Sequence, residues 1–148
     1  MILYKKVGFD EIDAVKPLWN KLSAYHKTVS EYFSEDFEKD TYGTRKEIIS
    51  KKEYVQIILA YEGETMIGYI IASMDKKQGE IESLFVDESY RGLEIGDRLM
   101  TLSREWIKRF KPESIKVSVA YGNQVISFYE KHGFLPRSII LKDNVIAI

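Results

Sequence analysis

The first part of the chain combines one strand-like segment with two helical patterns. Residues 2–7 form a short apolar-rich segment that predicts a β-strand. Between residues 10 and 29, apolar side chains recur at alternating spacings of three and four, which predicts an amphipathic α-helix. Pro17 lies inside this pattern and predicts a kink, because proline removes a backbone donor and crowds the preceding turn. A weaker helix is expected around residues 44–52.

The middle of the chain changes to the pattern of β-strands. Residues 54–61, 65–74 and 80–86 are rich in β-branched and aromatic side chains, and short glycine-containing turns separate them. Strands that follow one another through tight turns pair with their neighbours in sequence. These three segments therefore predict an antiparallel meander.

The last third of the chain predicts alternating helices and strands. Its elements are a helix over 95–110, a strand over 115–120, a short helix over 123–132 that ends at Gly133, and a closing pair of strands over 134–142 and 145–148. The helical connection makes strands 80–86 and 115–120 parallel. Together the elements predict an α+β fold, a mixed sheet of six to seven strands with about four helices on both faces. No linker or repeat interrupts the chain, so residues 1–148 are expected to form a single domain.

Composition and charge narrow the function classes. The chain is 45% hydrophobic and 30% charged, as in an ordinary globular domain, and its net charge of -1 argues against a nucleic-acid binder. The absence of cysteine excludes a disulfide scaffold, a thiol nucleophile and a cysteine-ligated metal. Only two histidines are present, far apart in sequence, so no metal site is expected. No apolar run approaches the ~18 residues of a membrane span and no secretory signal is visible, so we expect a cytoplasmic protein without a membrane partner.

The loop after strand 80–86 has the features of an anion site. It contains Arg91, Gly92 and Gly96 and leads into the helix over 95–110. Unpaired N–H groups and the positive end of the helix dipole meet at such a junction and suit a pyrophosphate. Glycines allow the backbone to approach a phosphate closely, and Arg91 adds a positive charge. The alternative is a plain turn in which the glycines serve only the chain reversal.

The segment over 121–134 contains a candidate acid. Asn123 can cap the short helix, and Tyr129 lies near the far end of that helix. A phenol with a pKa of ~10 can protonate a leaving thiolate. The alternative is that Tyr129 packs in the core with its hydroxyl bonded to a backbone carbonyl.

In this order along the chain, the two segments resemble the GNAT superfamily of acyl-CoA-dependent N-acyltransferases. The family's loop reads Arg/Gln-x-x-Gly-x-Gly/Ala, and here it reads Arg91-Gly-Leu-Glu-Ile-Gly96, with Glu94 in place of the inner glycine. An acidic side chain there would repel a pyrophosphate unless it points to solvent. The segment Ser127–Phe134 matches the family's Phe-Tyr-Glu-Lys-x-Gly-Phe signature. The family asparagine lies seven residues before the tyrosine, whereas Asn123 lies six before Tyr129.

The resemblance implies a role for each matching residue. The loop residues Arg91, Gly92, Leu93, Glu94, Ile95 and Gly96 would bind the pyrophosphate of coenzyme A. The strand backbone at Leu84, Phe85 and Val86 would follow the pantetheine arm, its amides would receive the thioester carbonyl, and Asn123 would reach the cofactor. Tyr129 would protonate the thiolate. Glu82 is the candidate base and lies on the same strand, 80–86, where the alternation of side chains places it on one face with Glu80. His26 is a competitor for this role.

The resulting hypothesis is an enzyme that transfers an acetyl group from acetyl-CoA to a primary amine without a metal. The acceptor stays open among a small-molecule amine, a polyamine, an aminoglycoside, an amino acid and a protein N-terminus. A catalytically weak acyl-CoA-binding regulatory module is the alternative, favoured by Glu94 and the shifted Asn123. A structural domain without a ligand ranks last. The apolar C-terminal strand pair suggests a homodimer, because exposed apolar strand edges tend to associate.

Overall fold

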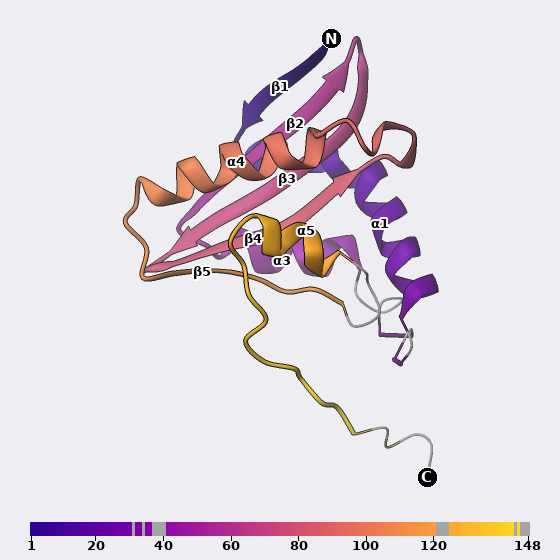
Figure 1. Cartoon of the computed structure of the whole chain (residues 1–148), viewed down its shortest axis with the longest axis vertical. Coiled ribbons are helices and arrows are strands. Elements are labelled where there is room, and N and C mark those ends of the chain that lie inside the picture. Colours follow the sequence, from indigo (N-terminus) through magenta and orange to yellow (C-terminus); the bar gives the residue numbers. More distant parts are fainter. Residues whose placement is uncertain (31, 34, 37–40, 121–124, 144, 146–148) are drawn as a thin grey trace.

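The protein is built on one mixed β-sheet (Figure 1). The computed structural model describes residues 1–30, 32–33, 35–36, 41–120, 125–143 and 145. Within these residues the strands are β1 (Ile2–Val7), β2 (Tyr54–Glu62), β3 (Thr65–Asp75), β4 (Gln78–Val86) and β5 (Ser114–Val117), in the order β1-β2-β3-β4-β5. The first four strands pair antiparallel, and β5 runs parallel to β4. The predicted meander, the parallel connection and the α+β class are confirmed.

Helices cover both faces of the sheet. In chain order they are η1 (Phe9–Val15), α1 (Lys16–Val29), α3 (Tyr42–Ser50), η2 (Glu88–Tyr90), α4 (Ile95–Lys108) and α5 (Ile126–Lys131). Figure 1 shows α4 and α5 on the near face, while α1 and α3 lie on the other face. No helix in the described part of the chain is both long and apolar enough to cross a membrane.

Alternating side chains of β2 and β3 belong to two hydrophobic cores, one on each face of the sheet. On β2, Ile58 and Ala60 face α4, whereas Ile57 and Leu59 join the core beneath η1, α1 and α3. Successive strand residues point to opposite faces, so a strand covered on both faces is apolar throughout. This explains why residues 57–60 are all buried.

Pro17 begins a helix and does not kink one. The chain runs as a 3₁₀ helix to Val15, and α1 starts at Lys16 with Pro17 in its first turn. The N–H groups of a first turn have no intrahelical partner, so the missing proline donor costs nothing there. The prediction of one kinked helix is therefore corrected to two helices that meet before the proline.

The predicted closing strand pair is wrong for the residues that the structure describes. Residues 134–143 form no strand, and β5 ends at Val117 rather than at residue 120, so the described sheet has five strands instead of six to seven. The side chains of Ile139, Ile140 and Leu141 are 75%, 92% and 90% exposed. A β-branched segment becomes a strand only where it can pair and pack, and this segment runs away from the sheet (Figure 1). Residues 146–148 of the predicted last strand lie outside the described residues.

Candidate active site

A bulge in β4 opens one edge of that strand. Ser83 pairs with Ile71 and Ile81 pairs with Ala72, so the backbone of Glu82 has no paired residue in the register with β3. On the other side, β5 follows β4 only from Gln78 to Ile81. A bulge bends a strand and increases its twist, which carries the rest of β4 away from β5. Among the residues that the structure describes, none pairs as a strand with the β4 backbone beyond Ile81 on the side of β5.

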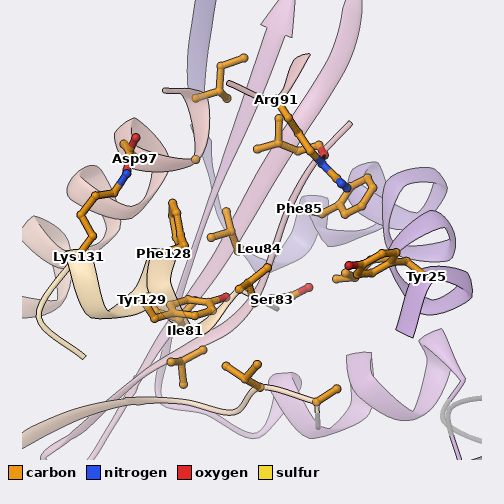
Figure 2. Close-up of a pocket in the computed structure, with 18 of the residues that line it drawn as sticks. Tyr25, Ile81, Ser83, Leu84, Phe85, Arg91, Asp97, Phe128, Tyr129 and Lys131 are labelled. Atoms are coloured by element: carbon orange, nitrogen blue, oxygen red, sulfur yellow. Dashed lines mark hydrogen bonds and ion pairs between the residues drawn. The ribbon is translucent and has the colours of Figure 1, made fainter. Parts of the chain in front are cut away.

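A cavity of about 550 Å³ lies along this open edge. It is bordered by β4, the loop before α4, α5, residues 117–120 and the face of α1 that carries Tyr25 (Figure 2). The predicted site residues at its border are Glu82, Leu84, Phe85, Val86, Arg91, Gly92, Glu94, Ile95, Gly96 and Tyr129. Leu93 does not border the cavity and is 61% exposed. Asn123 lies outside the described residues.

The loop before α4 borders this cavity and leads into a helix start without a side-chain cap. Gly92 has φ +82, and an added Cβ there would meet no atom within 4 Å. Glu94 also adopts the left-handed conformation, with φ 63, and it is the N-cap of α4 without a side-chain hydrogen bond to the helix. The first turn of α4 therefore keeps uncapped donors, which is the arrangement that binds phosphates. Glu94 is exposed, so its acidic side chain meets solvent.

Arg91 folds over the cavity and connects α1 to β4. Its Nε donates to the backbone carbonyl of Val86 at 3.1 Å. Its guanidinium lies 5.5 Å from the ring centroid of Phe85 and 5.9 Å from that of Tyr25 (Figure 2). Cation–π contacts of this kind hold the positive charge beside the opening.

Tyr129 reaches from α5 toward β4. Its ring makes edge contacts with Phe128 and Phe134, at centroid distances of 5.3 and 5.9 Å. Figure 2 shows the hydroxyl end of the ring directed toward Ile81 and Ser83. Burial raises the pKa of Tyr129 to about 12. Among the described residues no group forms a hydrogen bond with this hydroxyl, so the alternative in which a backbone carbonyl holds it is not observed there.

Glu82 occupies a buried ionic cluster on the α3 side of the sheet. Ser73 Oγ donates to Glu82 Oε2 at 2.6 Å, and Lys52 Nζ lies 3.6 Å from the same oxygen. Arg45 Nη2 lies 3.6 Å from Oε1, and the Glu82 side chain is only 1% exposed. Two cations and a hydroxyl compensate the cost of burying this carboxylate.

Lys52 joins Glu82 to Glu80. Its Nζ donates to Glu80 Oε1 at 3.2 Å. Burial acts to lower the pKa of Lys52, but the hydrogen bond that Lys52 donates to Glu80 and the negative charges of Glu80 and Glu82 outweigh this effect, so the pKa of Lys52 is raised. Sequence reasoning placed Glu80 and Glu82 on one face, which is correct, but missed Arg45, Lys52 and Ser73. They belong to α3, its following turn and β3, and no local motif marks them.

Comparison with protein families matches residues 22–134 to the acetyltransferase (GNAT) family. The match covers the loop before α4, the open edge of β4 and the tyrosine on α5. The chain belongs to the GNAT family. The resemblance drawn from Arg91–Gly96 and Ser127–Phe134 is thereby confirmed, and the five-stranded sheet is that of a GNAT domain.

Solved structures of similar fold include other acetyltransferases. A protein from Pyrococcus furiosus described as an acetyl transferase has a TM-score of 0.75 and 22% identity, over 95% of this chain and 99% of that one. Glucosamine-6-phosphate N-acetyltransferase from Arabidopsis thaliana has a TM-score of 0.62 and 20% identity, over 97% of both chains. AAC(6')-Iy, in complex with the bisubstrate analogue CoA-S-monomethyl-acetylneamine, has a TM-score of 0.58 and 14% identity, over 97% of this chain and 99% of that one. No curated protein sequence matches the chain significantly.

Identities this low show the shared GNAT fold alone. The cavity at the open edge of β4 is where this chain brings its loop, its tyrosine and its buried glutamate together. Within the described residues, no group of three or more histidine or acidic side chains could hold a metal ion. The individual roles of the cavity residues stay predictions.

Proposed function

We propose that this GNAT domain transfers an acetyl group from acetyl-CoA to a primary amine on a small molecule. The observation that carries the proposal is the placement of Tyr129 and Glu82 at one opening in the sheet. Tyr129 packs with the core on the α4 side, whereas Glu82 is held by Arg45 of α3. An acid and a base on opposite sides of a reacting thioester can serve the leaving group and the attacking amine separately.

The residues present fit coenzyme A. The uncapped first turn of α4 and the open space above Gly92 would receive the pyrophosphate, and the backbone of Leu84 to Val86 would lie along the pantetheine arm. We propose that Asn123 also contacts the cofactor. Acetyl-CoA supplies an activated acyl group, and the protein supplies orientation.

Proton transfer would then follow the geometry of the opening. The amine attacks the thioester carbon, so that a C–N bond forms and the C–S bond breaks. Glu82 accepts, through a water molecule, the proton that the amine loses, because its buried carboxylate does not face the opening directly. Tyr129 donates its proton to the departing sulfur, and backbone N–H groups of β4 stabilise the negative carbonyl oxygen. Both protein groups return to their starting state when a proton passes back through solvent.

Small-molecule acceptors are supported by two of the similar structures. One is a glucosamine-6-phosphate N-acetyltransferase, and the other was determined with a CoA-linked acetylneamine. The alternative, an acyl-CoA-binding regulatory module, is favoured by the acidic Glu94 in the proposed pyrophosphate loop.

Release of the CoA thiol tests the proposal. The protein is incubated with acetyl-CoA and, one at a time, spermine, lysine, glucosamine 6-phosphate and sisomicin, and the product is confirmed by mass spectrometry. We expect amine-dependent thiol release with at least one of these compounds. Calorimetry with acetyl-CoA distinguishes the alternatives, because a regulatory module binds the cofactor without thiol release, whereas absence of binding contradicts both functions.

A further inference from the structure

Tyr129 lies on α5, a helix too short to be stable without contacts to the rest of the protein. α5 has six residues and none of them is fully buried. A helix this short is unstable in isolation, because the cost of starting it exceeds the gain from its few hydrogen bonds. The placement of the Tyr129 hydroxyl therefore depends on the contacts that α5 makes with its neighbours.

The first turn of α4 supplies an ionic contact to α5. Asp97 Oδ1 lies 2.8 Å from Lys131 Nζ and 2.8 Å from His132 Nε2 (Figure 2 shows Asp97 and Lys131). The hydrogen bonds from Lys131 and His132 hold the pKa of the Asp97 carboxyl below its usual value. One carboxylate thus joins two consecutive residues that follow Tyr129 by two and three positions.

An apolar contact lies beside this ionic one. A Cβ added at Gly96 would lie 3.3 Å from Cε1 of Phe128, so the Phe128 ring packs directly on the backbone of the same turn of α4. Phe128 also packs against the rings of Tyr129 and His132, at centroid distances of 5.3 and 4.9 Å. The start of α4 therefore contacts α5 both before Tyr129, at Phe128, and after it, at Lys131.

We propose that Asp97 is a positioning residue that, through Lys131 and His132, fixes α5 so that the Tyr129 hydroxyl faces the reacting thioester. This inference rests on the proposed function of Tyr129. Asp97 directly follows Gly96, so the turn that would bind the pyrophosphate is also the turn that orients the acid. A carboxylate near a pyrophosphate would be unfavourable alone, and the pairing with Lys131 compensates its charge.

Asp97→Asn tests the inference because it keeps the size of the side chain and removes its charge. With acetyl-CoA and the most reactive amine of the panel, we expect kcat to fall about 10–100-fold, as for small misplacements of a catalytic group. The KM for acetyl-CoA should change less than about threefold, because the cofactor contacts remain. Lys131→Arg keeps the cation and should retain most of the turnover, whereas Lys131→Gln should not.

Asp13→Asn is the matched control. Asp13 also accepts hydrogen bonds from a lysine, Lys46 at 3.0 Å, and from a second side chain, Tyr42 at 2.9 Å, and it joins two helices away from the cavity. Hydrogen exchange of residues 126–133 gives a second measurement that needs no acceptor. We expect faster exchange there in Asp97→Asn than in Asp13→Asn.

The combination with Tyr129→Phe shows whether Asp97 acts through Tyr129. If it does, Asp97→Asn should lower kcat little further in the Tyr129→Phe background. Each of four results would overturn the inference. The first is a double variant whose loss of kcat is the product of the two single losses, and the second is an unchanged kcat in Asp97→Asn. The others are unchanged hydrogen exchange in α5 and an effect on the KM for acetyl-CoA alone. If Tyr129→Phe keeps full kcat, the proposed acid is wrong and the positioning role fails with it, while thiol release by the unsubstituted protein still establishes the transferase.

Discussion

Replacement of Tyr129 by phenylalanine separates the proposed acid from a structural tyrosine. The substitution removes one oxygen and keeps the ring contacts with Phe128 and Phe134. No described residue bonds the hydroxyl, so the free energy of unfolding should change by less than about 1 kcal/mol. Turnover should fall by about 10²–10⁴, or about 3–5 kcal/mol, in kcat and kcat/KM together.

The raised pKa of Tyr129 adds a pH dependence to this prediction. Since this pKa is about 12, the phenol stays protonated up to about pH 11, and activity should show no alkaline loss from this group below that pH. Burial favours the neutral form of Tyr129, so the raised pKa contributes fully to the free energy of unfolding below the unfolded pKa of about 10. This contribution is lost as pH rises through about 12. The total is about 3 kcal/mol, from a shift of about two pKa units. Phenylalanine should lack this alkaline loss.

The assay measures thiol release and urea unfolding on the same preparations. Tyr4→Phe is the matched control, because Tyr4 packs against the same core from β1, burial raises its pKa, and it does not border the cavity. A large loss of stability in Tyr129→Phe with normal turnover per folded molecule would refute the reasoning and make Tyr129 a structural residue. Unchanged stability together with unchanged turnover would show that the thiolate takes its proton elsewhere.

Three further predictions concern other parts of the molecule. Glu94→Gly should lower the KM for acetyl-CoA severalfold, because it removes a negative charge, and raise stability by up to about 1 kcal/mol, because glycine adopts the left-handed conformation without strain. Glu94→Gln removes only the charge and should change only the KM. Glu82→Gln should reduce kcat and cost about 2–4 kcal/mol in urea unfolding, since it leaves Arg45 and Lys52 without their buried anion, and normal turnover per folded molecule would exclude Glu82 as the base. The exposed apolar segment around Ile140 predicts self-association, so light scattering should give a mass above 17.3 kDa at tens of micromolar, and Ile140→Ser should reduce it; a monomer in both cases contradicts the homodimer.

The elements that could be predicted from the sequence are those decided by local pattern. β1 to β4 and α4 follow the spacing of apolar residues, because each buries its apolar residues against the rest of the protein. The loop Arg91–Gly96 and Tyr129 were found through a family motif, and the structure brings both to one cavity. Local information was sufficient for these features because a turn and a helix start depend on neighbouring residues.

The tertiary structure decided what depends on partners distant in sequence. The bulge at Glu82 exists only in the register between β3 and β4, and the partners of Glu82 come from α3, the turn after it and β3. Asp97 meets Lys131 and His132 across more than thirty residues, so no local pattern reveals the contact that holds α5. The C-terminal apolar segment shows the opposite case, because its β-propensity was clear and no sheet edge in the described chain received it. Strand pairing and buried ion pairs are long-range events, and their geometry follows from the folded chain as a whole.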